Sequence, residues 1–224
     1  MIVSLLVKVI AAIEPEKVIS HTEFQLACGI TSNSVAKSLL NYLQANDIGY
    51  YLSNDAVKFS ASDKIYAALL ALRVGGDIEQ VSIYLTWKDF EKLASELLIS
   101  FGYRTRTNVR LAKPRMEVDV VGTALDGFTL AVDCKHWKRN NLSSISSFCE
   151  KQAARAKRLI EHDKSISQVV PVVLTLHAES VSFVHEVPLV PILKFRSFLL
   201  DVKGFLPRMM YFRRRAPRTR PTLQ

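Results

Sequence analysis

The eight residues FTLAVDCK, at positions 128–135, set the interpretation of the whole chain. Successive side chains of a β-strand point to opposite faces of the sheet, so such a stretch divides into two sets. The first set is uniformly apolar and consists of Phe128, Leu130, Val132 and Cys134. The second set ends in an acid and a base two residues apart, Asp133 and Lys135. We therefore predict a strand that buries its apolar face and presents a charged pair near its end.

The preceding segment MEVDVV, residues 116–121, shows the same alternation. Its acidic residues, Glu117 and Asp119, share one face of the predicted strand. If the two strands pair, Asp119 lies beside Asp133, because directly opposed residues are about 5 Å apart. Two carboxylates at that separation repel each other, and a cation between them relieves the repulsion. A small set of oxygen ligands suits Mg²⁺ or Mn²⁺, which keep several water molecules when bound to protein.

A third carboxylate is expected from the helix predicted over residues 87–101, which ends at Gly102. At about 100° per residue, the apolar side chains of this helix fall within one arc, and Glu91 lies at the border of that arc. Glu96 points about 140° away from Glu91, towards solvent. We therefore predict that Glu91 belongs to the site and that Glu96 is a surface charge. Glu117 is the alternative third carboxylate, because it shares a strand face with Asp119.

Three strings in this order resemble the PD-(D/E)xK nuclease superfamily: FEKLASELLISFGY, EVDVVG and AVDCKHW. Within the superfamily, the chain is most similar to the Mrr-type restriction endonuclease domain, with archaeal Holliday-junction resolvases as structural relatives. The resemblance covers about residues 86–200. It implies an α/β fold whose core follows the order α-β-β-β-α-β, with a mixed sheet flanked by helices. The strand pattern 103–111, 116–122 and 127–135, the helix over 143–162 and the buried strand over 168–176 agree with that order.

Carried over residue by residue, the helical acid of the superfamily falls on Glu91 and the lone aspartate on Asp119. The (D/E)xK pair falls on Asp133 and Lys135. The proline of the superfamily name is replaced by Val118. Many Mrr-type domains carry Gln at the position of Asp133, so the aspartate here departs from that pattern and restores the general one.

The resemblance implies metal-assisted hydrolysis of phosphodiester bonds in DNA. Asp119 and Asp133 are expected to hold Mg²⁺ or Mn²⁺, with Glu91 completing the ligand set and the backbone carbonyl of Cys134 able to add an oxygen. Lys135 is expected to orient the attacking water or to stabilise the transition state. Gln152 is similar to polar helix residues near the site of some superfamily members. His136 and Trp137 either contact DNA or pack at the end of the strand.

The first part of the chain predicts a winged-helix domain, in which two short helices, a third helix and a hairpin follow one another. These elements are expected over residues 1–13 and 22–27, after Thr31 or Ser32, and around Ser53-Asn54-Asp55. The third helix offers only Lys37 as a cation, so it either reads DNA or serves packing and dimerisation. The predicted divisions are a winged-helix domain over 1–61, a helical linker over 62–85, a nuclease domain over 86–206 and a basic tail over 207–224.

The basic residues are unevenly distributed along the chain. Residues 1–85 carry 6 Lys and Arg against 8 Asp and Glu, whereas residues 86–224 carry 24 against 13. A basic excess favours a polyanionic partner, here DNA. The expected phosphate contacts come from the helix over 143–162 and from the tail, namely Lys151, Arg155, Lys157, Arg158, Arg213, Arg214 and Arg215.

Composition narrows the setting. With 49% hydrophobic and 23% charged residues in 224, the chain is expected to fold around a sizeable core. Three cysteines without CxxC spacing speak against a disulfide framework or a structural zinc site, and favour a reducing cytoplasm. No apolar run reaches the ~18 residues of a membrane helix. Related enzymes often form dimers, so a homodimer is a candidate assembly. Two rival functions stay open: a non-catalytic DNA-binding regulator on a nuclease fold, and a structure-specific repair nuclease.

Overall fold

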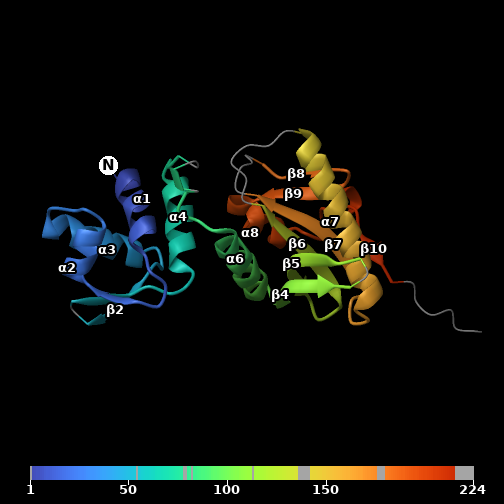
Figure 1. Ribbon diagram of the computed structural model, residues 1–224, viewed down its shortest axis with the longest axis horizontal. Coiled ribbons are helices and arrows are strands. Elements are labelled where there is room, and N and C mark those ends of the chain that lie inside the picture. The colour runs from blue at the N-terminus through green and yellow to red at the C-terminus, as the bar shows by residue number, and fades with distance from the viewer. Residues whose placement is uncertain are drawn as a thin grey trace, which may run out of the picture. The chain divides into compact units, whose positions relative to one another are not determined.

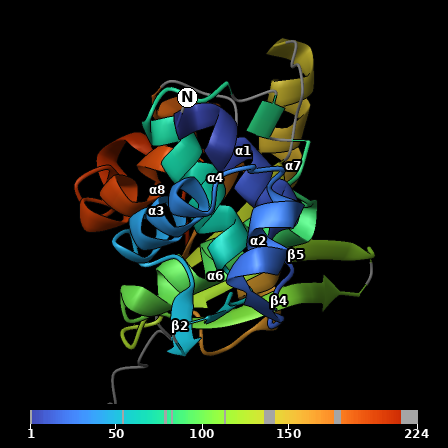
Figure 2. The ribbon, with the colours of Figure 1, turned by 90° about the vertical axis from the view of Figure 1, so that its left-hand side faces the viewer.

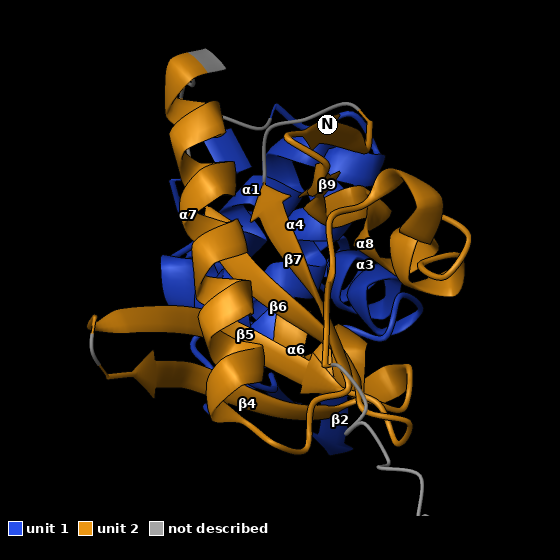
Figure 3. Ribbon diagram, turned by 90° about the vertical axis from the view of Figure 1, so that its right-hand side faces the viewer, with its two compact units in different colours: residues 1–93, 136–138 blue, residues 94–135, 139–224 orange. Residues whose placement is uncertain are grey.

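The computed structural model describes residues 2–53, 55–77, 80–81, 83–112, 114–135, 142–175 and 180–214. They form two compact units that divide inside helix α6 (Trp87–Ser100), between Leu93 and Ala94 (Figures 1 and 3). Within the described residues, no helix combines the length and the apolar character needed to cross a membrane.

The first unit is a group of helices packed on one another, with a small antiparallel sheet beside them (Figure 2). Its elements are α1 (Ile2–Ala12), β1 (Val18–Ser20), α2 (His21–Ala27), α3 (Asn33–Gln44), β2 (Tyr50–Ser53), β3 (Ala56–Lys58) and α4 (Asp63–Arg73). The sheet order is β1-β3-β2. Ser20 caps α2, because its side chain accepts a hydrogen bond from the Glu23 amide while the Glu23 side chain accepts one from the Ser20 amide. The predicted helices and hairpin are confirmed, and β1 is an addition.

Helix α4 belongs to the first unit because it packs against α1. The sequence instead predicted a linker over residues 62–85 and a division after residue 85. The apolar side chains of α4, Ile65 and Ala68 among them, are buried, so this part of the predicted helical linker belongs to the core of the first unit. The later part of the predicted linker includes Ile78, Glu79 and Ser82, which lie outside the described residues.

The second unit is a mixed α/β structure, as predicted, with one sheet flanked by helices (Figure 1). Its strands are β4 (Arg104–Leu111), β5 (Met116–Thr123), β6 (Phe128–Lys135), β7 (Gln168–Thr175), β8 (Ser182–Val184), β9 (Val187–Pro191) and β10 (Phe212–Arg213). Its further helices are α7 (Leu142–His162), α8 (Ile192–Leu200) and the 3₁₀ helix η1 (Leu206–Arg208). The sheet order is β4-β5-β6-β7-β9-β8, and β10 pairs with β7.

Strand directions change in the middle of this sheet. Strand β5 is antiparallel to both of its neighbours, β4 and β6, whereas β6, β7 and β9 are parallel. Strand β7 is buried along its whole length, which confirms the expectation from its continuous apolar run. Strand β6 is buried on both faces up to Cys134, so Asp133 is buried as well, although it stands on the charged face of the pattern.

Helix α7 lies across one face of the sheet, over β5, β6 and β7 (Figure 3). Ala156 and Leu159 of α7 share a buried cluster there with Ala131 and Val169 of the sheet. Gly122 allows α6 to approach the sheet, since a Cβ at this position would lie 2.9 Å from Leu98 Cδ1. Helix α6 ends as predicted at Gly102, whose φ is +81°, and the Tyr103 amide donates to the Leu98 carbonyl at 3.1 Å.

Candidate active site where β5 and β6 separate

Asp119 and Asp133 come together where the pairing of β5 and β6 ends. The two strands pair from Thr123 opposite Thr129 to Val120 opposite Val132, and one further step of this register would place Asp119 opposite Asp133. Instead, Asp119 Oδ2 accepts a hydrogen bond from the Cys134 amide at 2.7 Å. Burial raises the pKa of Asp119, and the charge of Asp133 raises it further. The structure therefore brings the two carboxylates together, as the strand pattern predicts.

Asp133 is buried between two cations. Its side chain is 1% exposed, and Lys135 Nζ lies 2.9 Å from Oδ2 while Arg155 Nη1 lies 2.8 Å from Oδ1. Lys135 also donates a hydrogen bond to Oδ1 at 3.0 Å. Oδ2 accepts no well-aligned hydrogen bond from the described residues, and neither does the buried Thr175 Oγ1, which stands beside Lys135 in the register of β6 and β7. Two buried oxygens at this end of the sheet are therefore left with spare hydrogen-bonding capacity.

Gln152 fixes Arg155 in this position. Its side chain is fully buried, and Nε2 donates to the Ala131 carbonyl of β6 at 2.7 Å. Its Oε1 accepts from Arg155 Nη1 at 3.3 Å. The predicted place of Gln152 near the site is thus confirmed, and its amide links α7 to β6 and to the guanidinium of Arg155.

Two more α7 side chains, Phe148 and Cys149, lie near Lys135 and Asp133. The Phe148 ring centroid lies 5.4 Å from Lys135 Nζ, a cation–π contact. Cys149 is buried, and burial, with a further contribution from Asp133, raises the pKa of its thiol to about 11. The thiol is therefore protonated at neutral pH and is not a nucleophile. Cys134 is buried on the apolar face of β6, as the alternation predicts.

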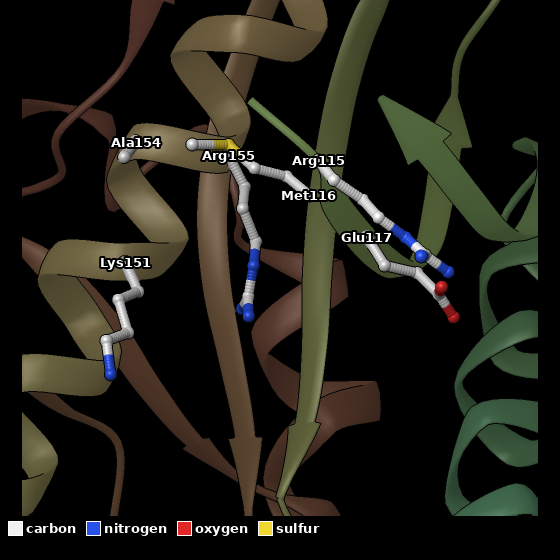
Figure 4. Close-up of a pocket in the computed structure, with 6 residues that line it drawn as sticks. All are labelled: Arg115, Met116, Glu117, Lys151, Ala154 and Arg155. Carbon is white, nitrogen blue, oxygen red and sulfur yellow. The ribbon is translucent and has the colours of Figure 1, made fainter. Parts of the chain in front are cut away.

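A pocket of about 390 Å³ opens next to Arg155, between α7 and the start of β5 (Figure 4). Its lining residues are Arg115, Met116, Glu117, Lys151, Ala154 and Arg155. Three of these side chains are cationic, and the single acid among them, Glu117, lies 3.2 Å from Arg110 Nε. The pocket is therefore electropositive and suits an anionic group. Glu117 therefore lines this pocket and pairs with Arg110, which differs from the role of third carboxylate considered for it.

The helical acids have the burial that the helix phase predicts. Glu91 is 6% exposed, whereas Glu96 is partly exposed. The compact units divide two residues after Glu91, so its role as a third carboxylate stays a prediction. Among the described residues, no three His, Cys, Asp or Glu side chains are grouped so that they could hold a metal ion. Asp119 and Asp133 are thus the paired carboxylates that the structure itself assembles.

The four α7 cations predicted to contact phosphates differ in their surroundings. Lys151 and Lys157 are exposed, and Lys151 Nζ lies 5.9 Å from the Phe148 ring centroid. Arg158 donates to Glu161 at 2.9 Å. Arg155 is paired with Asp133 and is only partly exposed, so its guanidinium is less accessible to DNA than the two lysines.

Two of the tail arginines, Arg213 and Arg214, form hydrogen bonds within the second unit. Arg213 donates to Gln168 at 3.2 Å, and the Arg214 guanidinium donates to the carbonyls of Ile160, Asp163 and Ile166 at the end of α7. Cations near carbonyls that lack helical partners stabilise a helix C-terminus. Arg215 lies outside the described residues, as do His136 and Trp137.

Sequence reasoning missed a row of arginines on the edge strand β4. Arg104, Arg106 and Arg110 are exposed and stand opposite Thr123, Val121 and Glu117. Arg104 and Arg106 share the face of Val121, which packs under α7 with Ala131 and so lies on the face of Asp133. Val109 and Leu111 pack in the same cluster after Asn108, whose φ is positive, so Arg110 points to the other face. The signal was present as alternation in RTRTNVR, which had been used only to predict a strand. Arg106 also forms an ion pair of 2.5 Å with Asp163, at the end of α7.

Comparisons with known proteins give little. No protein family matches the sequence, and no curated protein matches it either. A crystal structure of a protein of unknown function, AF1548, is similar over 38% of this chain and 46% of its own, with 22% identity and a TM-score of 0.29. The matched part is thus less than half of that protein's chain. A likeness of this size carries no functional conclusion.

Proposed function

We propose that the second unit is a metal-dependent deoxyribonuclease on a restriction-endonuclease-like PD-(D/E)xK core of the Mrr type. The observation that supports this most is the meeting of Asp119 and Asp133 where β5 and β6 separate, with Lys135 on the same strand face. Two acids of one strand pair and a following lysine are the donor set that this chemistry uses. Arg104 and Arg106 of β4 and the cations of α7 lie at the same face, as a polyanionic substrate requires.

The residues present fit Mg²⁺ or Mn²⁺. Asp119 and Asp133 offer carboxylate oxygens. Burial and the charge of Asp133 raise the pKa of Asp119, and a bound cation would offset both effects by stabilising the ionised carboxylate. Asp133 Oδ2, although paired with Lys135, accepts no well-aligned hydrogen bond from the described residues, and neither does Thr175 Oγ1, so both oxygens could make a further contact. In this proposal Asp119, Asp133 and the Cys134 carbonyl hold the ion, with Glu91 as the third carboxylate. When bound, the ion lowers the pKa of a coordinated water and neutralises charge on the scissile phosphate.

Lys135 would act at the mouth of the site. Its side chain is 22% exposed and is steadied by Asp133 and by the Phe148 ring. An ammonium group held in this way can donate to the attacking water or to a phosphoryl oxygen that gains charge in the transition state.

For the first unit we propose the winged-helix arrangement that its element order suggests. The outer face of α3 exposes Ser34, Lys37, Ser38 and Asn41. One cation on that face is few for strong phosphate binding. DNA reading by α3 and self-association through the first unit are both compatible with it, and the homodimer remains part of the proposal.

The rival function, a DNA-binding regulator without catalysis, has one observation in its favour. Lys135 and Arg155 already neutralise Asp133 without any metal. A site that is satisfied in this way could serve binding alone, because internal ion pairs would then replace a metal.

A cleavage assay separates these functions. The purified chain is incubated with plasmid, linear, single-stranded and branched DNA in Mg²⁺, Mn²⁺ or EDTA, beside an Asp133→Asn variant. The proposal expects metal-dependent cleavage that the variant loses. Binding without cleavage in all conditions would favour the regulator, and cleavage confined to branched DNA would favour a structure-specific repair nuclease.

A further inference from the structure

Arg155 lies between the Asp133 carboxylate and a pocket, and its positive charge could stabilise an anionic group at either place. Its Nη1 lies 2.8 Å from Asp133 Oδ1, and the same side chain lines the pocket of about 390 Å³ beside Lys151 and Arg115 (Figure 4). The guanidinium carries five donors, and those facing Asp133 and Gln152 come from one nitrogen, Nη1. The side chain is 24% exposed, so part of the group already meets the pocket or solvent.

The charges of the site balance without a metal ion. Asp119 and Asp133 are acids, and Lys135 and Arg155 are bases, so the group of four is neutral when all are ionised. A divalent cation held by the two carboxylates would leave an excess of two positive charges in a largely buried place, and an excess of one where Glu91 completes the ligand set. Like charges at close range in protein repel by several kcal/mol, about 4 at 4 Å for an effective dielectric constant of 20. One of the two bases is then expected to leave Asp133.

Arg155 is the base that can leave. Lys135 is two residues from Asp133 on the same strand and is also held over the Phe148 ring. Arg155 reaches Asp133 from α7, and rotation about its side-chain bonds can turn it into the adjoining pocket. A phosphate group in that pocket would meet Lys151, Arg115 and the planar guanidinium, which binds phosphate through paired hydrogen bonds.

We propose that Arg155 is a displaceable counter-cation of this site. In the metal-free protein it neutralises Asp133; when a divalent cation takes that carboxylate, Arg155 turns into the pocket between α7 and β5 and binds a phosphate of the DNA backbone there. This inference rests on the proposed metal-dependent nuclease. It makes Arg155 a positioning residue, and it predicts that metal and DNA strengthen each other's binding, since each favours the same position of the arginine.

The first measurement is Mn²⁺ binding to the full-length protein without DNA, followed by the EPR signal of free Mn²⁺. Arg155→Met keeps most of the volume and removes the competing charge, so we expect Mn²⁺ to bind about tenfold more tightly than to the parent, within the usual range for coupled sites. Lys164→Met is the matched control, because Lys164 is an exposed lysine two residues after the same helix and lies outside both the site and the expected phosphate contacts, and its Mn²⁺ affinity should equal that of the parent. Arg155→Lys should give an intermediate affinity.

The second measurement is the coupling between metal and DNA. A short duplex with phosphorothioate linkages, which resist hydrolysis, is titrated with and without Mn²⁺ and checked for integrity afterwards. In the parent and in Lys164→Met, Mn²⁺ should tighten DNA binding by more than it does in Arg155→Met, where we expect the coupling to be largely lost. Thermal melts establish that each variant is folded.

The outcomes are distinguishable. If the parent cleaves DNA and binds Mn²⁺, yet folded Arg155→Met binds Mn²⁺ no more tightly and keeps the full coupling, the displacement of Arg155 is wrong and the nuclease stands. If Arg155→Met does not fold, the Arg155→Lys variant decides in the same way. If the parent neither binds Mn²⁺ nor cleaves any DNA, the proposed nuclease fails and the displacement fails with it.

Discussion

Asp119 is the residue whose ionisation most clearly works against folding. Burial and the charge of Asp133 raise its pKa above the ordinary value of 3.8, so the folded protein binds a proton here more tightly than the unfolded chain. The ionised carboxylate therefore lowers the free energy of unfolding above the folded-state pKa. This loss disappears as the pH falls below the unfolded-state pKa, where both states are protonated.

We therefore expect Asp119→Asn to raise the melting temperature in metal-free buffer at pH 7, with a gain that shrinks towards pH 4. The amide oxygen can still accept the Cys134 hydrogen bond, so the geometry should persist. The same variant should lose metal-dependent cleavage. Asp126→Asn should instead lower the melting temperature at neutral pH. A hydrogen bond from the Phe128 amide lowers the pKa of Asp126, so the charge of this carboxylate stabilises the folded protein. A gain for Asp119→Asn that did not depend on pH would contradict the electrostatic explanation.

Lys135 can be tested apart from metal binding. Lys135→Ala removes a donor from the site but leaves both carboxylates, and Arg155 still neutralises Asp133. We expect cleavage to fall by about a hundredfold or more, as for the loss of one transition-state donor, while Mn²⁺ still binds. Single-turnover rates at saturating metal provide the measurement. Turnover equal to that of the parent would exclude the proposed role.

At the scale of the element, helix α6 separates two glutamates by orientation. Glu91 is buried and Glu96 partly exposed, in agreement with the helical phase. We expect Glu91→Gln to reduce the initial rate of metal-dependent cleavage by about tenfold or more, because it removes a ligand charge and keeps the shape. Glu96→Gln should retain the parent rate and shift stability by no more than about 0.5 kcal/mol.

Rates are compared at several Mg²⁺ concentrations, with melts to verify folding. An inactive Glu96→Gln variant would place the third carboxylate on the other side of α6. Full activity of both variants would exclude α6 as its source and leave Glu117 to be examined.

Elements with a long period were predictable, and very short ones were not. Strands β5 and β6 have eight residues each and contain stretches of alternation, and α6 and α7 repeat apolar positions over several turns. Strands β1, β8 and β10 have three, three and two residues, too few for a period to appear. They form because a neighbouring strand offers unpaired backbone groups, which is a tertiary effect.

The site was predictable as far as one strand pair determines it. Strand parity placed Asp119, Asp133 and Lys135 together, since register follows from the same apolar faces. The ion pair of Arg155 with Asp133 could not be predicted, because the two residues are 22 positions apart and meet only once α7 has docked on the sheet. For the same reason Arg214 could be recognised as a cation but not as a partner of the α7 carbonyls.

At the scale of the whole molecule, the uneven charge predicts where DNA binds. The fragment 86–224 should retain most of the affinity of the full chain, because residues 1–85 carry more acids than bases. It starts at Thr86, whose side-chain oxygen accepts a hydrogen bond from the Asp89 amide while the Asp89 carboxylate accepts one from the Thr86 amide. The fragment therefore keeps the N-terminal cap of α6. Equilibrium binding at several salt concentrations provides the test. Equal affinity of residues 1–85 alone would make the first unit the principal DNA-binding part.

Truncation of the tail should have two different effects, depending on where the chain is cut. Removal of residues 215–224 takes away three arginines and should lower the salt dependence of DNA binding by a slope of at most about 3, with the melting temperature unchanged. Removal of residues 208–224 also deletes Arg214 and β10, so it should lower the melting temperature. A shorter truncation that melts as low as the longer one would show that residues after Arg214 contribute to stability.

The arginine row on β4 also bears on how the protein avoids associating wrongly. An edge strand presents unpaired backbone groups that invite the edge of a second molecule, and exposed charges are a common protection against this. Two β4 edges brought together antiparallel would set Arg104, Arg106 and Arg110 of one copy against those of the other. Self-association by extension of the sheet is thus opposed at this edge at low ionic strength, and a polyanion lying along the row would remove that opposition.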